Sequence, residues 1–239
     1  MENILSGATL GGFDWSYIFV LIGGAISLFA SMGVKNAYAK YSQIPARSGL
    51  SGASVAEQIL RKNGISDVRV EHVNGELSDH YNPAKKLVNL SDVVYDKCSI
   101  AAISVAAHEC GHVLQHYKGY MPLKIRTMLV PIANFGTNIG LVILGGSLGL
   151  GLSPFLATIG IALFSLGILF QIVTLPVEFD ASKRALEILK EYEILSQDEI
   201  IPAQKVLKAA ALTYVAAVAN AILQLIRLII ASKGRSRLR

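Results

Sequence analysis

Residues 99–117 read SIAAISVAAHECGHVLQHY, an apolar-rich run that predicts a helix and contains an H-E-x-x-H pattern. The pattern is His108-Glu109-Cys110-Gly111-His112. Because residues i and i+4 share one face of a helix, both imidazoles can reach one tetrahedral metal ion. We therefore predict a metal site on a helix that extends from Ser99 to about Tyr117.

Glu109 follows the first histidine directly, so its carboxylate can reach a water on the open position of the ion and act as general base. Zinc lowers the pKa of such a water to about 7 and makes a nucleophile available at neutral pH. So short a pattern also occurs by chance. Its helical context favours a functional site, because a carboxylate among Ala, Ile and Val residues is costly without a function.

A catalytic zinc site needs a third protein ligand. His116 continues the spacing of four, but eight residues of helix rise about 12 Å, so we expect it beside the site or at the surface. Glu178 is the better candidate, since two membrane crossings return the chain to the side of His108. The alternative for Glu178 is a charge in the first turn of a helix. Asp180 is either an acceptor for a ligand imidazole or a solvated charge.

Four further residues are weaker candidates. His80 and Tyr81 precede a predicted strand and either polarise a scissile carbonyl or form a polar turn. That strand is a candidate sheet edge at which an extended substrate pairs. Arg184 and Tyr214 are candidates for transition-state contacts, with a helix-face charge and an aromatic residue of a span as the alternatives.

The composition indicates a membrane protein. Of 239 residues, 52% are hydrophobic and only 16% are charged, whereas soluble domains have about 25% charged residues. The net charge of +5 does not come from a basic stripe with interleaved aromatics, so we expect no nucleic-acid partner. The two cysteines, Cys98 and Cys110, are too few for a disulfide framework and are interpreted as small buried residues.

Charge asymmetry predicts the orientation in the membrane. Lys35, Lys40 and Arg47 follow the first apolar stretch and no Lys or Arg precedes it, so the N-terminus is expected outside and residue 34 onward in the cytoplasm. The second and third stretches form a hairpin around 151–154. We expect the fourth to span as well, although this leaves the basic tail 233–239 outside; a re-entrant segment or packing on the catalytic region is the alternative.

The predicted fold class is a mostly α, multi-span membrane protein with a cytoplasmic zincin-like catalytic region that contains a small β element. Its predicted parts are an N-terminal transmembrane helix (1–33), the catalytic region (34–127), a transmembrane hairpin (128–177), a cytoplasmic segment with the third ligand (178–205), and a C-terminal apolar helix with a basic tail (206–239).

Local signals predict the elements outside the spans. Ser54 and Glu57 form a capping-box pattern that opens a helix from Val55 to Lys62. The alternation from Asp67 to Val73 predicts a strand, and Lys86 to Leu90 predicts a second one. The charged stretch from Glu178 to Tyr192 predicts a further helix, followed by a loop.

Five stretches together carry a family resemblance: DHYNP (79–83), LS (90–91), VAAHECGHVLQH (105–116), PVEFDAS (176–182) and LTYVAA (212–217). They resemble the YugP-type membrane zinc peptidases of bacteria, and the match covers nearly the whole chain. The resemblance implies a membrane-bound neutral zinc peptidase with His108 and His112 as ligands and Glu109 as the base.

The layout is more distantly similar to the HtpX-type quality-control proteases and the prenyl-protein endopeptidases. Those families also place a transmembrane hairpin between H-E-x-x-H and a third-ligand glutamate, which implies Glu178 as that ligand here. Their glutamate is followed four residues later by an Asp or Asn that supports a ligand histidine. The corresponding residue in this chain is Ser182, a departure from that pattern.

The expected function is that of a zinc endopeptidase in the bacterial inner membrane, with its active site facing the cytoplasm and zinc as its cofactor. Its expected partners are protein or peptide substrates and the lipid bilayer; a membrane-protein partner or a second copy of the chain stays open. The rival is a catalytically silent, zinc-binding scaffold or adaptor. A transporter is a weaker alternative, because transport sites lie near the midplane of broken helices, whereas His108 lies far from any apolar span.

Overall fold

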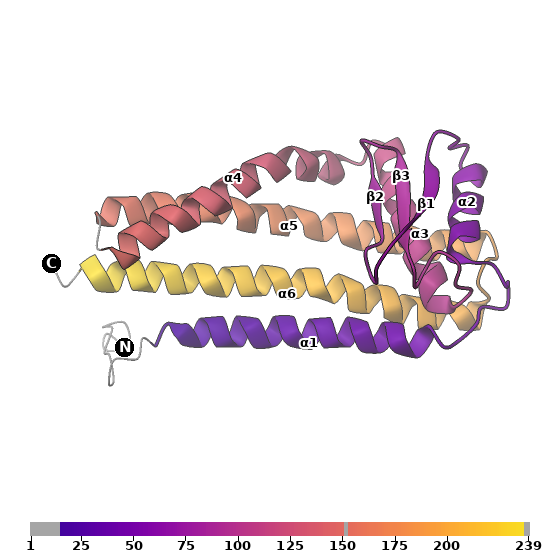
Figure 1. The fold of residues 1–239 in the computed structure, drawn as a ribbon, viewed down its shortest axis with the longest axis horizontal. Coiled ribbons are helices and arrows are strands. Elements are labelled where there is room, and N and C mark those ends of the chain that lie inside the picture. The colour runs from indigo at the N-terminus through magenta and orange to yellow at the C-terminus, as the bar shows by residue number, and fades with distance from the viewer. Residues whose placement is uncertain (1–14, 151–152, 237–239) are drawn as a thin grey trace. The chain divides into compact units, whose positions relative to one another are not determined.

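The computed structural model describes residues 15–150 and 153–236, so the acidic N-terminal segment, part of the hairpin turn and the end of the basic tail lie outside the described residues. Two compact units are present: residues 1–30, 125–174 and 214–239 form the first, and residues 31–124 and 175–213 form the second. The described residues contain six helices and one three-stranded sheet (Figure 1). The chain is therefore mostly helical, as predicted.

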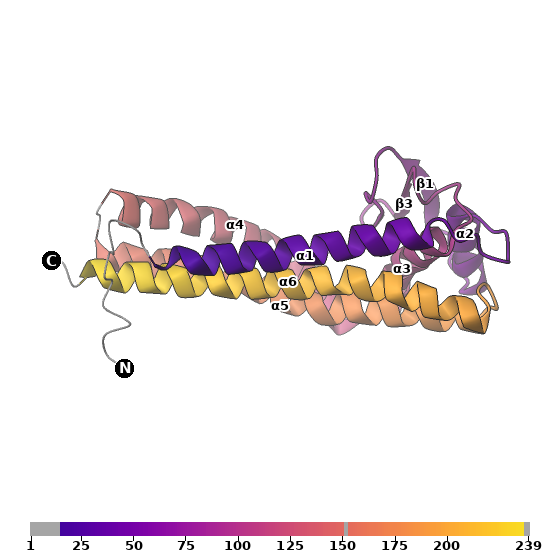
Figure 2. The same cartoon turned by 90° about the horizontal axis from the view of Figure 1, so that it is seen from below.

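The first unit consists of the apolar parts of four long helices, which run alongside one another (Figures 1 and 2). These helices are α1 (Tyr17–Tyr41), α4 (Met121–Gly149), α5 (Pro154–Glu191) and α6 (Gln197–Ser236). A Cβ atom on Gly140 of α4 would lie 2.8 Å from the carbonyl oxygen of Gly160 in α5. Glycine thus lets the two backbones approach closely, which is the usual packing of membrane helices.

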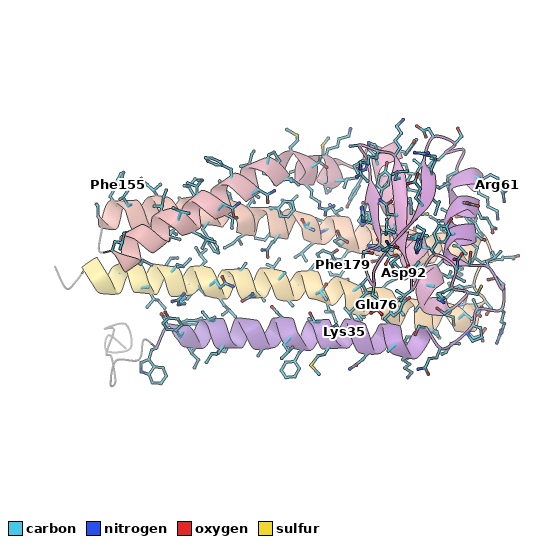
Figure 3. The ribbon with its side chains drawn as sticks, viewed as in Figure 1. Lys35, Arg61, Glu76, Asp92, Phe155 and Phe179 are labelled. Carbon is cyan, nitrogen blue, oxygen red and sulfur yellow. The ribbon has the colours of Figure 1, made fainter. Side chains whose placement is uncertain are left out.

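The surface of the first unit is apolar. Phe155, at the start of α5, is 70% exposed (Figure 3), and Val142 of α4 is 72% exposed. All four helices are long and apolar enough to cross a membrane. Each predicted apolar stretch therefore lies in a candidate span. The loop predicted after Tyr192 is present but short, because α5 ends at Glu191 and α6 already begins at Gln197.

The second unit contains a sheet with strand order β1-β3-β2, formed by β1 (Arg69–Val73), β2 (His80–Asn82) and β3 (Leu87–Ser91). Strand β3 pairs with β1 in parallel and with β2 antiparallel (Figure 1). The two predicted strands are confirmed as β1 and β3. The edge position considered for β3 is wrong, because β2, which the sequence did not predict, pairs with its second side.

Two helices of this unit have serine caps. Helix α2 (Gly52–Lys62) begins at Gly52 rather than Val55, because the side chain of Ser51 accepts a hydrogen bond from the Ser54 amide. The capping residue predicted for this helix is therefore wrong, while its predicted end at Lys62 is confirmed. Helix α3 (Ile100–Tyr117) confirms the predicted helix and is capped by Ser99.

Helix α3 lies in the core of the second unit. It packs against α2 and against β2 and β3. The core cluster also includes residues of α5 and α6, and its largest fully buried side chains include Ile59, Leu90, Ile103, Val113 and Leu189. Burial of such a side chain stabilises the fold by about 1.5–3 kcal/mol. The helix that bears the H-E-x-x-H pattern is therefore fixed by apolar packing on several sides.

Helix α5 passes through Pro176 without ending. The new helix predicted to begin at Glu178 is therefore wrong, because this residue lies inside α5. Proline in a helix interior costs about 3 kcal/mol or more. Val177 and Ala181, which follow it, are fully buried, and this packing offsets the cost of the lost backbone hydrogen bond.

Candidate metal centre

Three side chains converge in the second unit, and the same three are the predicted metal ligands. Helix α3 supplies His108 and His112, helix α5 supplies Glu178, and one ligand atom from each lies within 4.8 Å of the others. The Nε2 atoms of the two histidines lie 3.3 and 3.5 Å from Oε2 of Glu178. Tetrahedral zinc with ligands at about 2.1 Å holds them about 3.4 Å apart. The donor set and its spacing therefore fit a zinc ion.

The cluster is largely shielded from solvent. The side chains of His108 and His112 are 14% and 12% exposed, and that of Glu178 is 3% exposed. Burial alone would lower the pKa of His112, but hydrogen bonding to Glu178 and the nearby charge of Glu109 raise it above the ordinary value. Without a metal ion, the neighbouring carboxylates therefore favour the protonated form of His112 more than in a free histidine.

Glu109 lies beside the cluster and is itself buried. Its Oε2 atom accepts a hydrogen bond of 2.9 Å from the backbone amide of Tyr81 in β2. Strand β2 therefore holds one oxygen of the carboxylate predicted to act as general base. Tyr81 therefore contacts the site through its main-chain amide.

The second nitrogen of each histidine also has a partner. Nδ1 of His108 lies 3.2 Å from Oγ of Ser182, and Nδ1 of His112 lies 3.0 Å from Oε1 of Gln115. Such contacts are typical of metal-binding histidines, because they fix the ring orientation and leave Nε2 for the ion. Ser182 thus occupies the supporting position at which the distant families have Asp or Asn. Sequence reasoning missed Gln115, although its position three residues after His112 places both on one helix face.

The remaining candidates lie around the cluster rather than in it. Nδ1 of His116 lies 2.8 Å from the hydroxyl of Tyr81. Nδ1 of His80 lies 2.8 Å from the carbonyl of Ser78, and its Nε2 lies 3.0 Å from the Asn89 amide, so the contacts of His80 are those of the polar turn and sheet. Asp180 accepts a hydrogen bond from Gln115.

Four other residues from the sequence reasoning are not part of the ligand cluster. Arg184 donates to Asp180 along α5, and Tyr214 belongs to the first unit. Cys110 is fully buried with its thiol directed to the backbone of α2 rather than to the ligand cluster, and burial raises its pKa far above the ordinary range. The prediction of burial is confirmed for Cys110 but wrong for Cys98, which is half-buried.

Together, the helical fold with four candidate spans and the His-His-Glu cluster define a protein of the membrane metallopeptidase type. The chain belongs to the family described as "Putative neutral zinc metallopeptidase", which matches residues 16–233. It is similar to the "Putative membrane protease YugP" of Bacillus subtilis (strain 168), with 45% identity over 215 residues, which cover 89% of this chain and 95% of that protein. No solved structure matches the chain. The family resemblance inferred from the sequence is therefore confirmed.

Proposed function

We propose that the protein is a zinc-dependent endopeptidase of the bacterial inner membrane, which cleaves peptide bonds of membrane or membrane-proximal proteins on the cytoplasmic side. The observation that carries this proposal is the convergence of His108, His112 and Glu178 at zinc-ligand spacing, with Glu109 next to the first histidine. The name of the relative, a membrane protease, supports protein substrates.

The residues of the site divide the work between them. Zinc held by His108, His112 and Glu178 would polarise the scissile carbonyl and lower the pKa of a bound water. Glu109 takes the proton of the attacking water and returns it to the leaving amine nitrogen. The Tyr81 amide fixes the orientation of the Glu109 carboxylate, because the hydrogen bond joins them at 2.9 Å.

Strand β2 is the candidate surface for substrate alignment. It is the last strand of the sheet and pairs with β3 on one side, so its other side is an edge. Helix α3 packs against this strand. An extended peptide that adds to this edge gains main-chain hydrogen bonds from groups other than the Tyr81 amide, which donates to Glu109. Its backbone would lie beside Glu109, because Tyr81 of β2 already contacts that carboxylate.

The proposed orientation rests on charge and on the number of crossings. Lys35 and Lys40 lie in the last part of α1, and positive residues favour the cytoplasmic side. Helices α4 and α5 are both candidate spans and lie between α3 and Glu178 in the sequence. Two crossings return the chain to its starting side, which brings Glu178 to the side of His108 and His112.

The test compares wild type with Glu109→Gln in detergent or in vesicles, by metal analysis and by cleavage of a casein-type or membrane-protein substrate. Glu109→Gln should retain zinc and lose about 10²–10⁴-fold in rate, the usual contribution of a general acid–base. Glu187→Gln is the matched control, because its side chain is 61% exposed on α5. Metal-dependent cleavage that survives Glu109→Gln would contradict the proposal, and zinc binding without any cleavage would favour the scaffold alternative.

A further inference from the structure

Gln115 of α3 is a fully buried polar side chain, which is uncommon and requires hydrogen-bond partners. Its amide nitrogen donates to the carbonyl of Val177 at 2.7 Å and to Oδ2 of Asp180 at 2.9 Å. Its amide oxygen lies 3.0 Å from Nδ1 of His112. Both N–H groups and the carbonyl of this amide are therefore used.

These partners decide which way the amide points. A backbone carbonyl and a carboxylate can only accept hydrogen bonds, so both must face the NH₂ group of Gln115. The amide oxygen then faces His112, and an oxygen can only accept. Nδ1 of His112 must therefore carry the proton. In the neutral ring that binds a metal ion, the lone pair is then on Nε2, the atom that faces Glu178 at 3.5 Å.

An ion pair supports the far end of this chain of contacts. Nε of Arg184 donates to Oδ2 of Asp180 at 2.5 Å, and the two side chains are only 21% and 24% exposed. Arginine stays charged at all accessible pH values and can only donate, so the Asp180 carboxylate oxygen accepts in this contact. The same carboxylate oxygen receives the Gln115 amide. The order of the contacts is therefore Arg184, Asp180, Gln115 and His112, and the donor and acceptor of each hydrogen bond are fixed.

Two partners of Gln115 flank the third ligand, Glu178, in the sequence, and the third partner is itself a predicted ligand. Val177 and Asp180 belong to the turn of α5 that carries Glu178, whereas His112 belongs to α3. One side chain thus connects the two helices that supply the metal ligands, and it does so directly at the ligands.

We propose that Gln115 is a positioning residue of the metal centre, which holds His112 in the Nδ1–H form and fixes the Glu178 turn of α5 against α3. This inference rests on the proposed function, because it assigns Gln115 a task at that same site. Gln115 acts on the ion only through His112 and α5. Its loss should therefore weaken metal binding before it affects any chemical step.

The experiment measures the zinc dissociation constant of the full-length protein in detergent, by competition with a chromogenic chelator. Gln115→Met should bind zinc about 10–100-fold more weakly, the usual effect of removing a partner of a ligand histidine. Gln204→Met, at an exposed position of α6, is the control and should bind as wild type does. An unchanged constant for Gln115→Met would overturn the inference.

A charge exchange tests the direction of the hydrogen bonds and does not depend on the folding of Gln115→Met. Gln115→Glu should also bind zinc about 10–100-fold more weakly, because it sets a second carboxylate against Asp180. Adding Asp180→Asn supplies an amide that donates to the new carboxylate, which still accepts from His112, so part of the affinity should return, although the Val177 carbonyl stays without its donor. A structural role alone predicts no such rescue, and its absence would overturn the inference. Wild type that binds no zinc would instead overturn the proposed function itself.

Discussion

Gly111, between the two ligand histidines, is a position at which even a methyl side chain should disturb the metal centre. A Cβ atom added to Gly111 would lie 2.6 Å from the carbonyl oxygen of Ala181 and 3.1 Å from its carbonyl carbon. Both contacts are to the backbone of α5, so no side chain can move aside. Gly111→Ala must therefore push α3 and α5 apart next to Glu178.

The displacement follows from the contact distance. Carbon and oxygen atoms in contact prefer about 3.4 Å, so the helices must separate by about 0.8 Å, less whatever they gain by tilting. Functional sites tolerate about 0.5 Å of misplacement, and overpacking of this kind costs about 1–3 kcal/mol. We expect zinc binding at least about 10-fold weaker, since even indirect loss of ligand support costs 10–100-fold. Chelator competition measures the affinity and thermal unfolding measures the stability.

Gly33 is the matched control for this substitution. It also lies inside a helix, α1, and a Cβ atom added there meets nothing within 4 Å. Both substitutions gain helix propensity of up to about 1 kcal/mol, and only Gly111→Ala creates a clash. Should Gly111→Ala bind zinc as tightly as wild type and unfold at the same temperature, the argument from helix spacing would be refuted.

Three further predictions concern stability and pH. The raised pKa of His112 stabilises the metal-free protein at pH values below the pKa of an unfolded histidine, about 6.5. This stability is lost as the pH rises through the pKa of His112 in the folded protein. Thermal unfolding between about pH 6 and pH 9 should show the loss, and a melting temperature that rises with pH would contradict it. Zinc at about 1,000 times its dissociation constant should stabilise the protein by about 4 kcal/mol, a shift that His108→Ala should abolish. Asp79→Ala should cost about 1–3 kcal/mol in denaturant unfolding, because the fully buried Ser91 loses the acceptor of its amide and hydroxyl, whereas an exposed carboxylate such as Asp96 should cost little when replaced by Ala.

Local sequence patterns predicted those parts of the fold that depend on near neighbours. Helix α3 follows from its apolar run, and the four long helices follow from hydropathy. Strands β1 and β3 follow from alternation and turn residues. In each case the signal lies within a few turns or residues of the chain, so no tertiary contact is needed to recognise it.

Predictions failed where distant contacts override local preference. Pro176 indicates a helix end, but the buried residues beyond it keep α5 continuous. Strand β2 has three residues, too few for a period to be recognised, and is formed by its pairing with β3. The cap of α2 is Ser51 rather than the predicted Ser54, because both serines are suitable caps and the local sequence does not distinguish them.

The sequence by itself determined His108, Glu109 and His112, because a spacing of four residues on a helix places two imidazoles on one face whatever surrounds them. Only the tertiary structure decided how the site is completed. Glu178 arrives on another helix, Ser182 meets a histidine 74 residues away, and Gln115 meets the carbonyl of Val177 62 residues away. The physical reason is that an orienting hydrogen bond needs a distance and a direction. Between two helices both are set by their packing, and for α3 and α5 Gly111 allows the close approach.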